Sequence, residues 1–142
     1  MAPNDASVLE NVASIVVAVG RHQEAVEVVQ RGRILDPFFS PLIIGASFAQ
    51  ALFVLGRYEE STEAARYCVQ RAPTNLLCRE SLLRALGETG PAAEARAELA
   101  ELLRQSPGYT VSEYLRRAAA NRRDPAGVAR LAEGLRKAGM PE

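Results

Sequence analysis

The chain has 142 residues, 48% of them apolar and 24% charged, which is the balance of a globular domain with a core of its own. With 17 basic and 17 acidic residues its formal net charge is zero, which argues against non-specific attraction to nucleic acid or to anionic membranes. The longest apolar run, 15–19, is too short to cross a bilayer, and the N-terminus lacks a signal-peptide pattern, so we expect a cytoplasmic protein.

Helix formers dominate the chain, and start and stop signals divide it into eight predicted helices. Capping residues or prolines precede three of them: Asp5 the first, Ser40-Pro41 the third and Asp124-Pro125 the last. A capping box of Thr110 and Glu113 opens the seventh. The predicted helices span 6–19, 23–35, 41–55, 58–71, 74–86, 91–105, 111–121 and 125–138.

The two cysteines, Cys68 and Cys78, are too few for a disulfide framework. Each lies in a segment predicted to be helical. Because disulfides are rare in reducing compartments, we expect both residues to be buried free thiols.

A six-residue pattern with glycine first and a small residue last recurs three times. Its glycines are 36 and then 34 residues apart, and the proline that follows each keeps the same two intervals. A glycine and a proline that recur together every 34 to 36 residues are typical of helix–turn–helix repeats, whose units must stack to bury their apolar faces. We expect the glycines to adopt the left-handed conformation and the small residues to allow close helix crossings. The repeat-defining residues are Gly20, Ala25, Pro37, Gly56, Ser61, Pro73, Gly90, Ala95 and Pro107.

These residues resemble the tetratricopeptide repeat, which favours glycine at the turn, alanine five residues later, a terminal proline and a period of 34. The resemblance covers three units, about 6–39, 40–75 and 76–109, and it departs from the family in lacking the tryptophan of the first helix. It implies an all-α protein, a right-handed α-α superhelix of three helical hairpins. We expect two further helices, within about 110–139, to cap the array in a single domain, 1–142.

Two short segments, Gly-Arg-Tyr-Glu-Glu at 56–60 and the C-terminal 134–142, are similar to the repeat region of bacterial class III adenylate and guanylate cyclases and related signalling proteins. In that family the repeats follow a catalytic domain, and nothing in this chain resembles that domain. The resemblance therefore implies a non-catalytic scaffold, an accessory module of a longer signalling protein.

The concave surface of such an array is lined by the first helix of each unit, and its exposed positions, read from the repeat register, form the candidate binding groove. A protein or peptide partner, of open identity, would bind there. An RNA-binding repeat is the alternative, against which the balanced charge and the apolar groove residues argue. The candidate groove residues are Glu10, Ser14, Gln50, Phe53, Glu80 and Arg84.

The sequence holds no catalytic pair, cofactor fingerprint or metal-ligand pattern, so we expect neither an enzyme nor a bound cofactor or metal. His22 is the only histidine, and we expect it to pack at a helix turn. Tyr109 and Tyr114 are expected in the core or in a cap. Four arginines suit a helix C-terminus better than a nucleic-acid patch, because no aromatic residues interleave with them. They are Arg116, Arg117, Arg122 and Arg123.

The predicted first helix, 6–19, is apolar almost all round, whereas a terminal cap should have a polar outer face. We therefore expect either an element upstream of it, such as the protein's own upstream domain, or a homodimer formed through this helix.

Overall fold

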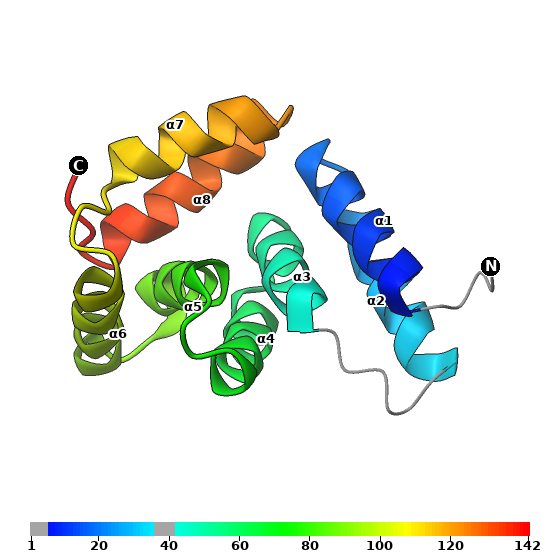
Figure 1. Cartoon of the computed structure of the whole chain (residues 1–142), viewed down its shortest axis with the longest axis horizontal. Coiled ribbons are helices and arrows are strands. Elements are labelled where there is room, and N and C mark those ends of the chain that lie inside the picture. The colour runs from blue at the N-terminus through cyan, green and yellow to red at the C-terminus, as the bar shows by residue number, and fades with distance from the viewer. Residues whose placement is uncertain (1–5, 36–41) are drawn as a thin grey trace.

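The computed structural model describes residues 6–35 and 42–142, and for residues 6, 7, 10, 35 and 42–44 it describes the backbone alone. The described part of the chain is all-helical, as predicted (Figure 1). Within it, no helix combines the length and the apolar character needed to span a bilayer. The helices are α1 (Ala6–Ala18), α2 (His22–Leu35), α3 (Leu42–Val54), α4 (Tyr58–Arg71), α5 (Leu76–Thr89), α6 (Ala92–Gln105), α7 (Val111–Asn121) and α8 (Pro125–Lys137).

Helix boundaries follow the local signals closely. At the start of α7 the Thr110 hydroxyl accepts a hydrogen bond from the Glu113 N–H at 3.1 Å, as the capping box predicts. Asp124 caps α8 in the same way. The exception is α5, which begins after an Asn75 cap and continues through Gly87 to Thr89, beyond its predicted end.

Two of the three repeat glycines adopt the left-handed conformation that the repeat predicts. The backbone angle φ is +84° at Gly20 and +78° at Gly56, values that a side chain disfavours. At Gly90 φ is −88°, so the prediction is wrong there. Pro91 follows directly, and its ring steers the preceding residue towards extended backbone.

From α1 to α6 each helix packs against the next one along the chain. The small residues predicted at the crossings, Ala25, Ser61 and Ala95, are buried. The Ser61 hydroxyl also donates to the carbonyl oxygen of Ala49 at 2.7 Å, which ties α4 to α3. Pro73 and Pro107 follow the ends of α4 and α6, whereas Pro37 lies outside the described residues.

The last two helices fold back over the others (Figure 1). α8 packs against α5 and α3 as well as against α7. The turn after α7 reaches α1, where the Arg123 N–H donates to the carbonyl oxygen of Ala18 at 2.8 Å. The expectation that α7 and α8 only cap the end of the array is therefore incomplete, because they also contact its beginning.

Cys68 and Cys78 form a disulfide between α4 and α5, so the prediction of two free thiols is wrong. The short turn between these helices makes them pack side by side and brings the two Cα atoms to 5.4 Å, within the usual range for a disulfide. Both residues are fully buried. The prediction relied on the cellular compartment, whereas the pairing follows from the geometry of neighbouring helices.

Candidate functional site

Three of the predicted groove residues are buried beneath the C-terminal helices. Phe53, Glu80 and Arg84 have exposed fractions of 2%, 1% and 0%, so the prediction that these positions are exposed is wrong. The cause is a close crossing of α5 and α8: a methyl group at Gly134 would lie 2.6 Å from Phe53 Cζ and 3.0 Å from Arg84 Cβ. One at Gly87 would lie 2.5 Å from the Gly134 carbonyl oxygen. Glycine at both positions therefore allows α8 to cover this face of α3 and α5.

A buried ionic cluster joins α5 to α7. The Glu80 carboxylate accepts hydrogen bonds from the guanidinium groups of Arg84 and Arg117 and from the Tyr109 hydroxyl. The Arg84 guanidinium also lies 4.9 Å from the centre of the Tyr114 ring. Burial, together with the nearby Glu80 carboxylate, raises the pKa of Tyr109 well above its ordinary value, so its hydroxyl remains a donor. The carboxylate is thus fully satisfied by its three donors.

A second set of polar contacts fastens the α7–α8 turn to the first helices. Arg122 donates from Nη1 to Gln50 Oε1 at 2.6 Å and from Nη2 to the Val17 carbonyl oxygen at 3.3 Å. His22 Nε2 lies 2.6 Å from Asp124 Oδ2, in keeping with a packing role for the histidine. Burial alone would raise the pKa of Asp124, but hydrogen bonds from His22 and from a backbone N–H outweigh it and hold that pKa below its ordinary value.

Between these two sets of contacts lies an open cavity of about 340 Å³, lined by residues of α1, α3, α5 and α7 and of the turn that follows α7. The predicted residues Ser14, Gln50 and Glu80 line it, so the structure does bring these three together. The side chain of Glu10, the remaining candidate, lies outside the described residues. The C-terminal part contributes the other charged and aromatic lining residues, Tyr114, Arg117 and Arg122.

Sequence reasoning missed the C-terminal contribution to this cavity. Tyr109 and Tyr114 are buried, as predicted, but nothing linked them to the groove residues. A signal was present: Tyr114, Arg117 and Asn121 are spaced three and four apart and so share one face of α7. The arginines do not form one patch either, because Arg117 pairs with Glu80 while Arg116 faces away and pairs with Glu113. A nucleic-acid surface would need them together on an open face.

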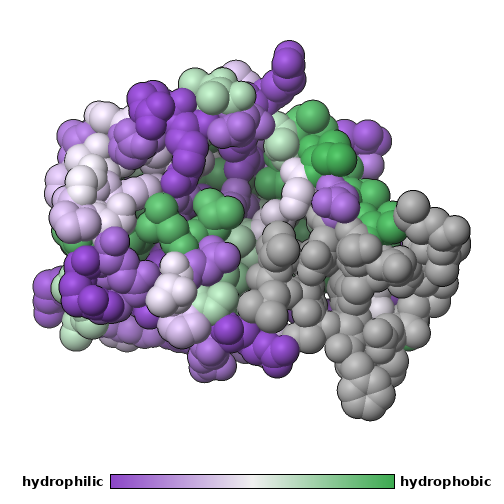
Figure 2. All heavy atoms as spheres, viewed as in Figure 1, coloured by the Kyte–Doolittle hydropathy of each residue, from purple (hydrophilic) through white to green (hydrophobic). Residues whose placement is uncertain are grey.

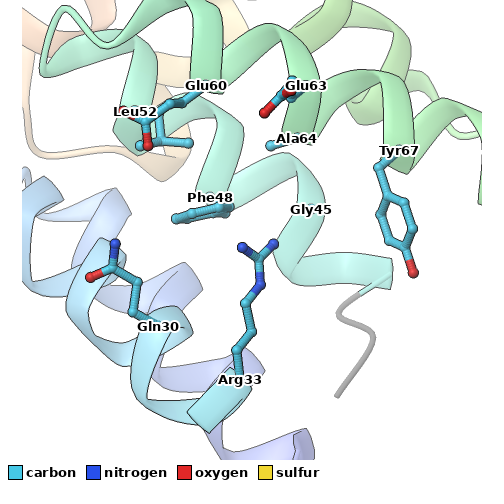
Figure 3. Close-up of a pocket in the computed structure, with 9 residues that line it drawn as sticks. All are labelled: Gln30, Arg33, Gly45, Phe48, Leu52, Glu60, Glu63, Ala64 and Tyr67. Carbon is cyan, nitrogen blue, oxygen red and sulfur yellow. The ribbon is translucent and has the colours of Figure 1, made fainter. Parts of the chain in front are cut away.

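A second hollow, of about 280 Å³, lies between α2, α3 and α4 (Figure 3). Phe48 lies within it, and the Arg33 guanidinium is 5.0 Å from the centre of the Phe48 ring. The Glu60 carboxylate is paired with Arg57 at 2.7 Å. Because no polar atom of its lining is among the buried atoms without a partner, this hollow gives less reason to expect a ligand than the cavity beside α7.

Nowhere in the described ranges do three His, Cys, Asp or Glu side chains come together as a metal site would require. No protein-family model matches the sequence, and no curated protein matches it either. The tetratricopeptide and cyclase resemblances therefore remain predictions.

Proposed function

We propose that the chain is a non-catalytic protein–protein interaction scaffold, a right-handed superhelix of three tetratricopeptide-like hairpins followed by two C-terminal helices. The sequential packing from α1 to α6 supports this proposal, as do the buried small residues Ala25, Ser61 and Ala95. From the resemblance alone, the proposal extends to an accessory module of a bacterial signalling protein such as a nucleotide cyclase. A cytoplasmic location would require the buried Cys68–Cys78 bond to persist against cellular reductants.

The observation that carries the interaction role is an exposed apolar stripe on α1. Val12 and Ile15 on α1 are 38% and 63% exposed, and Val19, directly after the end of the helix, is 45% exposed; their spacing of three and four residues places them on one face. Figure 2 shows hydrophobic residues gathered over this helix. A helix whose opposite face, with Ala13 and Val17, is already buried in the fold presents this stripe to a partner.

We propose a second copy of the chain as the occupant of the α1 stripe. A single stripe of this kind is self-complementary, because a two-fold axis places the same residues of both copies in contact. The formal net charge of zero means that two copies do not repel each other through their overall charge. The protein's own upstream domain would be the alternative occupant.

Sedimentation velocity over a range of concentrations tests this interface. We expect the unmodified chain to dimerise in a concentration-dependent way and Ile15→Glu to remain monomeric, because the substitution buries a charge in the interface. Ile34→Glu is the matched control, since Ile34 is 81% exposed on α2, outside the stripe, and its substitution should leave the dimer intact. An unmodified chain that stays monomeric at every concentration would contradict the dimer and leave the stripe to a different protein.

A further inference from the structure

The cavity beside α7 holds more hydrogen-bond donors than its surroundings satisfy. Within the described part of the chain, six buried side-chain polar atoms have no hydrogen-bond partner, and two of them, the Tyr114 hydroxyl and Arg122 Nε, belong to residues that line this cavity. Both residues line the cavity; Tyr114 is 3% exposed and the Arg122 side chain is 10% exposed. The great majority of buried polar groups in proteins have a hydrogen-bond partner, so two unpartnered donors on residues that line one cavity point to a ligand.

The charged side chains around the cavity carry a net positive charge. Arg117 and Arg122 line the cavity, and a third guanidinium group, that of Arg84, lies 4.9 Å from the centre of the Tyr114 ring. They face two carboxylates: Glu80, whose oxygens already accept three hydrogen bonds, and Asp124, 3.9 Å from Arg122. The excess of one positive charge, with donors left over and the acceptors occupied, favours an anion and disfavours a cation.

The remaining walls set the size and character of the ligand. Val17, Ala18 and Ala118 add apolar surface to the lining of the cavity. Leu77 also lines it and is 44% exposed, so the cavity reaches the surface there. A volume of about 340 Å³ lies at the lower end of the range for small-molecule sites.

We propose that this cavity binds a small organic anion, whose carboxylate or phosphate group accepts hydrogen bonds from Tyr114 and Arg122 and whose short apolar part lies against Val17 and Ala118. The inference does not depend on dimerisation, because the α1 stripe does not line the cavity. The inference gives a small-molecule ligand to the lining residues Ser14, Gln50 and Glu80, which the sequence analysis placed in a peptide-binding groove.

Benzoate, phenyl phosphate and the neutral benzyl alcohol are suitable probes, since they share a ring and differ in charge. Each is titrated into the full chain while thermal unfolding and the side-chain Nε–H signals of arginine are followed by NMR. We expect a saturable rise in Tm and a shift of the Arg122 signal with at least one anion, and neither with benzyl alcohol. Benzoate alone would identify a carboxylate ligand, and phenyl phosphate alone a phosphate ester. No response to either anion at millimolar concentration, or an equal response to benzyl alcohol, overturns the proposal.

Variants then locate the site. Tyr114→Phe keeps the ring that packs against Arg84 and removes only the hydroxyl, so the Kd should rise roughly fivefold to tenfold. Arg122→Gln should weaken binding further, and if its lost contacts to α1 and α3 prevent folding, Tyr114→Phe decides alone. Arg116→Gln is the matched control, because its side chain is 74% exposed on the same helix and outside the cavity. Binding by Tyr114→Phe as tight as that of Arg116→Gln would refute the assignment.

Discussion

Replacing Glu80 tests whether the buried cluster fixes the C-terminal helices to the rest of the fold. Glu80→Leu leaves the Arg84 guanidinium fully buried without its carboxylate, and it also removes the acceptor of Arg117 and Tyr109. Breaking a buried pair by removing one partner costs about 3–5 kcal/mol, a large part of the 5–15 kcal/mol that stabilises a typical domain. For a chain of this length the same loss lowers Tm by roughly 6–20 °C.

Urea unfolding followed by circular dichroism measures the effect, with two companion variants. The double variant Glu80→Leu/Arg84→Met removes both buried charges, and we expect it to recover at least about 2 kcal/mol relative to Glu80→Leu, because apolar replacement of a buried pair is often close to neutral. Glu101→Gln is the control, since it breaks an exposed pair with Arg104 and should change the stability far less. A loss below about 1 kcal/mol for Glu80→Leu, or a double variant no better than the single one, would refute the reasoning.

Three further predictions concern stability. In the denatured, unreduced chain, Cys68 and Cys78 should not react with an alkylating reagent. Reduction should lower the free energy of unfolding by about 3 kcal/mol, because the disulfide closes a loop between residues 10 apart in the sequence. Alkylation of both thiols before reduction would contradict the disulfide. Because the pKa of Tyr109 is raised in the folded state, the unfolded chain loses that proton first above about pH 10, so stability should fall there by up to about 1.4 kcal/mol per pH unit. Tyr109→Phe should flatten this decline, and an unchanged slope would exclude the residue as its source. Gly134→Ala should destabilise the chain by about 1–3 kcal/mol through overpacking against Phe53, although alanine is the better helix former; a gain in stability would show that no close crossing exists.

Helix positions could be predicted because their signals are local. The Thr110 and Asp124 caps each act within three residues, and in the structure both side chains accept a hydrogen bond from a backbone N–H of the helix that they begin. Gly90 was mispredicted for an equally local reason, the proline that follows it. The repeat pattern treats the three turn glycines as equivalent, although only Gly90 is followed by a proline, Pro91.

Burial of the candidate groove could not be predicted in the same way, because it depends on a contact between residues far apart in the sequence. Phe53 meets Gly134, and Glu80 meets Arg117, only once α7 and α8 fold back. The sequence held one unused clue: a glycine inside a helix costs about 1 kcal/mol relative to alanine and often marks a close approach of another backbone. Gly87, which was taken to lie beyond the end of its helix, is such a residue.

The fold-back of α8 changes where a partner can bind. A peptide in the predicted groove would have to displace α8 from Phe53 and expose Arg84, which is fully buried, so that groove is unavailable while the C-terminal helices stay docked. The two sites that we propose for recognition, the outer stripe around Ile15 and the cavity around Tyr114, share no residue. The two proposals therefore separate by mutation: Ile15→Glu should abolish the dimer and leave anion binding unchanged, whereas Tyr114→Phe should weaken anion binding and leave the dimer unchanged. If either substitution impaired both properties, the stripe and the cavity would be coupled through α1, which contributes Ile15 to one and Ser14 and Val17 to the other.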